Sequence, residues 1–157
     1  MLIGYAAGAF DLFHIGHLNI LRQARRHCDF LVAGVVSDEV LQQTKGQSPV
    51  IPLQERMEIL RHINLVDKVV SETSTDRLSI WREVRFDVFF KGDDWKGTKK
   101  AAEVERRLGA VGVKVVYFPY TARTSSTLLR RALQILERQE PATPAGHSYR
   151  NEEQQPC

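Results

Sequence analysis

The chain has 157 residues, of which 22 are Lys or Arg and 19 are Asp or Glu, so the formal net charge is +3. This length fits one domain with a sizeable core, and the scattered basic residues favour solvated helix faces over a nucleic-acid surface. No apolar run approaches the roughly 20 residues of a membrane span, and the chain starts in a strand without a basic leader. Cys28 and Cys157 lie far apart without metal spacing, which indicates free thiols and a cytoplasmic protein.

Apolar runs of strand length alternate with helix-like segments. Strands are predicted at residues 2–7, 30–36, 68–70, 88–91 and 113–118. Helices are predicted at residues 18–24, 37–41, 52–63, 78–84, 101–108 and 124–136. This alternation predicts an α/β fold, a doubly wound, Rossmann-like five-stranded parallel sheet with strand order 3-2-1-4-5. The composition then shifts to Pro, Gln, Glu, Ala and Gly, which predicts a disordered tail over residues 137–157 behind a domain of residues 1–136.

The first predicted strand ends in small residues, and a helix follows. Such a strand, turn and helix N-terminus form a phosphate site, because backbone N–H groups and the helix dipole attract an anion. His14 and His17 are three residues apart and can point from one helix face at the same anion. The turn lacks the Walker and dinucleotide-binding patterns. Zinc is disfavoured, because the sequence offers no further ligands at metal spacing, so no protein-bound metal is predicted.

Several motifs together resemble the cytidylyltransferase family of the nucleotidyltransferase superfamily. The stretch Gly8-x-Phe10-Asp11-Leu12-Phe13-His14-x-Gly16-His17 resembles the first signature of this family. Lys91-Gly92-Asp93-Asp94-Trp95-Lys96-Gly97 looks like the G-D-D-W segment of its bacterial glycerol-3-phosphate members. Further matches are Pro52-x-x-x-Arg56, Val66-Asp67 and Thr124-Ser125-Ser126-Thr127. The resemblance covers roughly residues 2 to 136.

The resemblance implies transfer of CMP from CTP to a small phosphomonoester similar to glycerol 3-phosphate, with release of pyrophosphate and with Mg²⁺ accompanying the nucleotide. It also implies a homodimer. Four residues are predicted to be catalytic, namely His14, His17, Lys45 and Arg123. The predicted nucleotide-binding residues are Gly8, Ala9, Phe10, Asp11, Gly16, Gly92, Asp94, Thr121, Thr124, Ser125 and Ser126. The predicted acceptor-binding residues are Arg56, Asp67 and Trp95.

The physical roles differ among these residues. The histidines would donate hydrogen bonds to the phosphates, and Lys45, in a flexible polar stretch over residues 42–48, would close over them. Asp11 could orient a histidine, accept a magnesium-bound water or cap the turn. Asp94 could recognise the base or hold magnesium, and Trp95 could pack against a loop or the base.

The chain departs from the family pattern at two positions. Tyr120-Thr121 stands where the family has Arg-Thr, and Asn64 stands where an arginine usually precedes the V-D pair. We expect Arg123 to reach the triphosphate in place of the arginine missing at Tyr120. An adenylyltransferase for a coenzyme or sugar phosphate and a non-catalytic nucleotide-binding regulator remain alternatives. The chain is too short for a class I aminoacyl-tRNA synthetase.

Overall fold

The computed structural model describes residues 1–120 and 123–139, and these residues form a parallel five-stranded sheet in the order β3-β2-β1-β4-β5. The strands are β1 (Ile3–Gly8), β2 (Phe30–Val36), β3 (Lys68–Glu72), β4 (Val88–Gly92) and β5 (Lys114–Phe118). The predicted fold class and strand order are confirmed. The first strand lies at the centre of the sheet, so the turn that follows it opens at the point where the strand order reverses.

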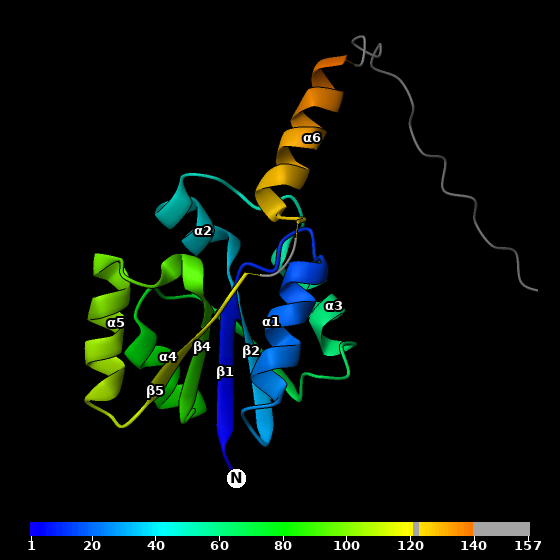
Figure 1. Cartoon of the computed structure of the whole chain (residues 1–157). Coiled ribbons are helices and arrows are strands. Elements are labelled where there is room, and N and C mark those ends of the chain that lie inside the picture. Colours follow the sequence, from blue (N-terminus) through cyan, green and yellow to red (C-terminus); the bar gives the residue numbers. More distant parts are fainter. Residues whose placement is uncertain (121–122, 140–157) are drawn as a thin grey trace, which may run out of the picture.

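Helices cover both faces of the sheet, and α2 and α6 lie beyond the carboxyl ends of the strands (Figure 1). The helices are α1 (Ile15–Arg25), α2 (Asp38–Lys45), α3 (Leu53–Arg61), α4 (Arg77–Val84), α5 (Lys99–Gly109) and α6 (Ser126–Gln139), with a short 3₁₀ turn, η1 (Asp93–Trp95). One apolar core under α1 and α3 includes Leu21, Leu60 and Phe90. A second core, under α4 and α5, includes Tyr5 and Phe89.

Two helix boundaries near the ends of the strands differ from the prediction. Helix α1 begins three residues earlier, at Ile15, because His14 caps it. Helix α2 continues past residue 41 to Lys45 and ends where Gly46 adopts a left-handed conformation (φ 64°). Lys45 is therefore the last residue of a helix, and the prediction that places it in a flexible polar stretch is wrong in that respect.

Helix α6 stands away from the sheet (Figure 1) and exposes the side chains of Leu128, Leu133, Ile135 and Leu136. It continues to Gln139, so the predicted domain boundary after residue 136 falls inside the helix. Residues 140–157 lie outside the described residues, and the disordered tail stays a prediction. Cys28 is a half-buried free cysteine, and Cys157 lies outside the described residues. Within the described ranges, no helix has the length and apolar character needed to cross a membrane.

Candidate active site

The turn after β1 has an unusual backbone that places two histidines at the start of α1. Phe10 and Leu12 both have a positive φ (52° and 51°), a conformation that costs L-residues free energy and is often found at functional sites. The Phe10 side chain is buried, and its ring lies 5.5 Å from the ring of His17. Packing of Phe10 therefore stabilises the turn and supports the histidine behind it.

The two histidines form a reciprocal cap at the N-terminus of α1. The Gly16 N–H donates to Nδ1 of His14 at 3.0 Å, and the His14 N–H donates to Nδ1 of His17 at 3.3 Å. An imidazole whose Nδ1 accepts a hydrogen bond carries its proton on Nε2 when it is neutral. The cap therefore leaves both histidines an Nε2–H group for a ligand or a protein acceptor.

Both histidines are kept neutral by their surroundings. Burial, reinforced by the neighbouring His14, lowers the pKa of His17 to about 3, and burial also lowers the pKa of His14. Nε2 of His14 lies 3.3 Å from the Ser126 hydroxyl, which itself donates to the carbonyl oxygen of Asp11 at 2.7 Å. Because that hydroxyl proton is already used, Ser126 can accept from the His14 Nε2–H, which agrees with the neutral tautomer.

A cavity of about 380 Å³ lies between the histidines and the start of α6; we call it the histidine cavity. Ser125 caps α6, because its hydroxyl accepts from the Leu128 N–H at 3.1 Å. The N-termini of α1 and α6 thus meet at one cavity, an arrangement that favours a polyanion. The lining residues are His14, His17, Asp94, Tyr120, Ser125, Ser126 and Thr127.

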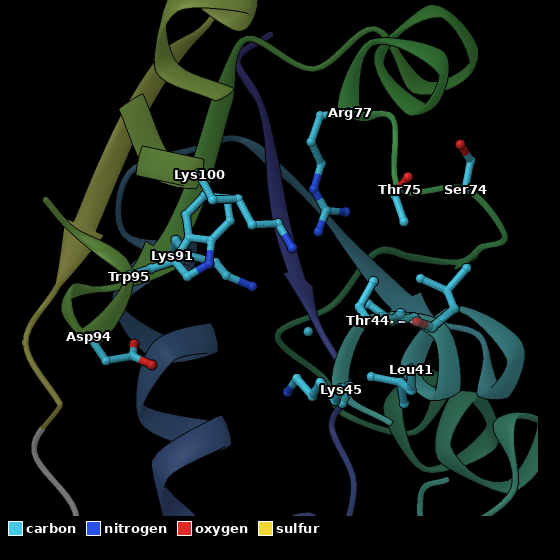
Figure 2. Close-up of a pocket in the computed structure, with 14 residues that line it drawn as sticks. Leu41, Thr44, Lys45, Ser74, Thr75, Arg77, Lys91, Asp94, Trp95 and Lys100 are labelled. Carbon is cyan, nitrogen blue, oxygen red and sulfur yellow. Dashed lines mark hydrogen bonds between the residues drawn. The ribbon is translucent and has the colours of Figure 1, made fainter. Parts of the chain in front are cut away.

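A second cavity, of about 260 Å³, lies beside the first and has a different lining; we call it the basic cavity. Figure 2 shows its basic side chains reaching inward from α2, α4, β4 and α5. Its polar lining is formed by Thr44, Lys45, Ser74, Thr75, Arg77, Lys91, Asp94 and Lys100, with Gly8, Ala9 and Trp95 among the remaining lining residues. Asp94 lines both cavities and marks where they meet.

The sequence analysis missed six polar residues of the basic cavity. Thr44 lies on α2, Ser74, Thr75 and Arg77 follow β3, Lys91 belongs to β4, and Lys100 is the second residue of α5. The rule that parallel sheets bind ligands beyond the carboxyl ends of their strands points to all but Thr44 and Lys100. No single motif contains all six, because they come from four separate segments.

Arg56 and Asp67, predicted to bind the acceptor, do not face either cavity, and this prediction is wrong. The Arg56 side chain is fully buried and donates to the carbonyl oxygens of Ile51, Ala9 and Val36 and to the carboxylate of Asp38. It ties the turn after β1 to β2 and α3, and its donors are used in doing so.

Asp67 lies at the opposite end of the sheet, where the strands begin. It precedes β3 and accepts from Arg25 and from the Leu31 N–H at the start of β2. Because the strands are parallel, their amino ends lie a full strand length from the histidines. The V-D pair therefore contributes to joining β2, β3 and α1, and not to the site.

Asp11 is completely buried and serves as an anchor. Its carboxylate accepts from the N–H groups of Val50 and Ile51 and forms an ion pair with Arg130 of α6 at 2.8 Å. Burial alone would raise its pKa, but these hydrogen bonds outweigh it and hold the pKa below the usual value. Asp11 thus joins the turn to α6, a role that the sequence analysis did not weigh, and a magnesium-bound water would find both carboxylate oxygens engaged.

The other predicted residues are distributed as follows. Gly92 is buried, and a Cβ there would lie 2.7 Å from a carboxylate oxygen of Asp94, so glycine lets Asp94 lie close to the strand end. The carbonyl oxygen of Thr124 accepts from the Tyr120 hydroxyl. Arg123 is exposed and, among the described residues, makes no hydrogen bond or ion pair. Thr121 lies outside the described residues, and the substitution by Arg123 stays a prediction.

Comparison with known proteins agrees with this geometry. Residues 5–132 match the family described as cytidylyltransferase-like. The chain belongs to this family. It is thus a member of the nucleotidyltransferase superfamily, as predicted from the histidine turn.

The relatives of this cytidylyltransferase-like chain differ in their substrates. Ethanolamine-phosphate cytidylyltransferase from Arabidopsis thaliana is 43% identical over 95 residues, which is 57% of this chain and only 22% of that protein. FAD synthase from Thermococcus onnurineus is 32% identical over 131 residues, covering 80% of this chain and 87% of that enzyme. A lipopolysaccharide core biosynthesis protein from Thermoplasma volcanium shares the fold, with a TM-score of 0.67, 24% identity and coverage of 79% of this chain and 99% of the other.

Proposed function

We propose that this protein transfers CMP from CTP to the phosphate of a small phosphomonoester and releases pyrophosphate. The observation that carries the proposal is the pair of neutral imidazoles where the N-termini of α1 and α6 meet. His17 can donate from Nε2 to a phosphate oxygen, and His14 can do so in exchange for its contact with Ser126. The triphosphate would occupy the histidine cavity, and the acceptor phosphate would enter from the basic cavity.

In this reaction an oxygen of the acceptor phosphate forms a bond to the α-phosphorus of CTP, and the bond from that phosphorus to the bridging oxygen of pyrophosphate breaks. Both reactants are anions, so catalysis consists mainly of alignment and charge stabilisation. His14 and His17 would donate to the oxygens on which charge develops, without transferring their protons. Lys45, at the end of α2, would neutralise charge between the acceptor and the α-phosphate.

Mg²⁺ would enter with the triphosphate. Asp94 is exposed and is the only carboxylate among the described residues that line the two cavities. One carboxylate together with nucleotide phosphates and water is a usual environment for Mg²⁺, so the residues present fit this ion. When bound, it would neutralise charge on the phosphates.

Four observations bear on the choice of nucleotide. The Gly92-Asp93-Asp94-Trp95 segment and the name of the Arabidopsis relative support CTP. The FAD synthase match, which extends over most of both chains, supports ATP as the alternative, because FAD contains an adenylate. A basic cavity of about 260 Å³ suits a small acceptor better than a flavin, which argues against FAD synthesis. We retain CTP on the Gly92-Asp93-Asp94-Trp95 segment.

The test is pyrophosphate release, measured with each of the four common ribonucleoside triphosphates against a panel of phosphomonoesters. We expect the fastest turnover with CTP and loss of turnover on removing Mg²⁺. Faster turnover with ATP for every acceptor would move the assignment to adenylyl transfer. Nucleotide binding without pyrophosphate release would indicate a regulator. We also propose that the protein is a cytoplasmic homodimer. Sedimentation equilibrium would test whether the dimer forms.

A further inference from the structure

The basic cavity carries more positive charge than one phosphate group requires. Lys45, Arg77, Lys91 and Lys100 line it, against the single carboxylate of Asp94 at its border with the histidine cavity. In Figure 2, Arg77 and Lys100 point toward the same space, with Lys45 at the opposite end. The positive charge therefore surrounds the cavity. The carbon body of a bound acceptor lies near these cations, as does its reacting phosphate.

Two of these cations are held in place by buried contacts. Arg77 forms an ion pair with Glu72, whose other carboxylate oxygen accepts from the Tyr5 hydroxyl at 2.8 Å. Glu72 and Tyr5 are both completely buried behind the cavity wall, so they orient Arg77 and offset its charge from behind. The three lysines of the cavity, Lys45, Lys91 and Lys100, have no such buried carboxylate partner among the described residues.

Lys91 is fixed within the wall of the cavity. Its ammonium donates to the Ala7 carbonyl at 3.1 Å and lies 5.3 Å from the centre of the Trp95 ring. It sits one strand away from the phosphate turn, so its charge acts on the acceptor at short range. Lys100 approaches from the start of α5, on the other side of Trp95 (Figure 2).

We propose that Lys91 and Lys100 make this cavity selective for phosphomonoesters whose carbon body is uncharged or acidic, and exclude acceptors that carry an amine. The inference rests on the proposed function and defines its acceptor class. An ammonium group in the basic cavity would meet the like charges of Lys45, Lys91 and Lys100, which come from three elements. Asp94 is the one carboxylate among the described lining residues that would offset them, and like-charge contacts of this kind disfavour binding strongly. The name of the Arabidopsis relative gives an amine-bearing acceptor, so the inference separates this chain from that protein.

The experiment compares kcat/KM for three acceptors of similar size, with the best triphosphate held at saturation. These are phosphoethanolamine, glycerol 3-phosphate and 3-phosphoglycerate, whose bodies are cationic, neutral and anionic. We expect phosphoethanolamine to be at least about tenfold poorer than each of the other two. A smaller difference, or a preference for phosphoethanolamine, overturns the inference while leaving nucleotidyl transfer intact.

Charge reversal tests the assigned residues. Lys100→Glu should shift the ratio of kcat/KM for phosphoethanolamine to that for glycerol 3-phosphate by about tenfold in favour of the amine. Lys91→Met keeps an apolar stem beside Trp95 and should shift the same ratio in the same direction by about threefold. The matched control is Lys99→Glu, because Lys99 is exposed, adjacent in sequence and not part of the cavity lining. Equal effects of the Lys99 and Lys100 variants would overturn the assignment.

A binding measurement separates this inference from the proposed function. Trp95 lines the cavity, and in a Trp81→Phe background it is the only tryptophan, so its fluorescence reports occupancy by each acceptor without turnover. One result would be that no triphosphate gives pyrophosphate while phosphoethanolamine still binds more weakly than glycerol 3-phosphate and 3-phosphoglycerate. In that case the proposed reaction fails and the selectivity stands. Equal binding of all three acceptors, or binding of none, overturns the selectivity.

Discussion

The two cavities differ in how they present positive charge to an anion. The histidine cavity uses neutral imidazoles and the N-termini of α1 and α6, and its residues come mainly from two continuous segments. The basic cavity uses full charges from four elements that are distant in sequence. Neutral donors held by a cap suit a group that every member of a family must bind, whereas charged side chains on separate segments, which can change one at a time, suit the part of the site that selects an acceptor.

The strongest test of this comparison is removal of the histidines. We expect His14→Ala and His17→Ala each to lower kcat by about 100-fold or more, because each removes a preorganised donor to the reacting phosphates. Steady-state kinetics with CTP measure this, with His62→Ala as control, since His62 is exposed, follows the last residue of α3 and lines neither cavity. A near-normal kcat in either variant would remove that histidine from the mechanism.

A methyl group at Gly16 tests whether the cap geometry itself matters. A Cβ at this position would lie 2.8 Å from Cε1 of His14 and 2.8 Å from the Tyr120 hydroxyl. Gly16→Ala should therefore displace the histidine ring and lower kcat by roughly tenfold or more. Gly109→Ala is the control, because nothing lies within 4 Å of a Cβ at Gly109. An unchanged kcat would show that the cap tolerates movement of His14.

The exposed Arg123 tests whether the start of α6 supplies a cation as well as a dipole. If Arg123 replaces the arginine missing at Tyr120, Arg123→Ala should lower turnover with CTP by roughly tenfold. Arg123→Lys should still impair turnover, because it loses the planar fork. Tyr120→Arg in the Arg123→Ala background should restore part of the rate. A silent Arg123→Ala variant would mean that the histidine cavity works without this cation.

The pH profile distinguishes the two cavities without a mutation. Burial, together with the nearby Arg77, lowers the pKa of Lys91 to about 8, while Glu72 and Asp94 partly oppose the shift. As the pH rises through about 8, Lys91 of the free protein loses its charge, so kcat/KM for the acceptor should fall severalfold above that pH. Both histidines stay neutral across this range. Lys91→Met should remove the alkaline decline, and a decline that persists in this variant would assign it to another group.

The smallest effect is expected at Asp67. Asp67→Asn should change kcat and KM by less than about twofold, because Asp67 lies at the amino ends of the strands, where it pairs with Arg25. Loss of this partly exposed pair should lower the free energy of unfolding by about 1 kcal/mol, measured by urea denaturation. A large rise in KM for the acceptor would restore the role in acceptor binding that the sequence analysis gave to Asp67.

The sequence by itself determined the fold and the histidine cavity. Strand-length apolar runs alternating with helices allow few topologies, and the order with the first strand at the centre is confirmed. His14 and His17 are local in sequence, so a short motif contains both donors and the helix start that orients them. The same holds for Ser125 and Ser126 at the start of α6.

Only the tertiary structure decided which polar residues face the site. Arg56 and Asp67 stand in motifs as conspicuous as the histidines, yet one is buried among backbone carbonyls and the other lies at the far edge of the sheet. Arg77, Lys91 and Lys100 belong to no shared motif and meet because parallel strands bring their carboxyl ends to one edge. The direction in which a side chain points and its contacts with distant segments are set by the folded chain. Residue type and spacing in the sequence do not predict them.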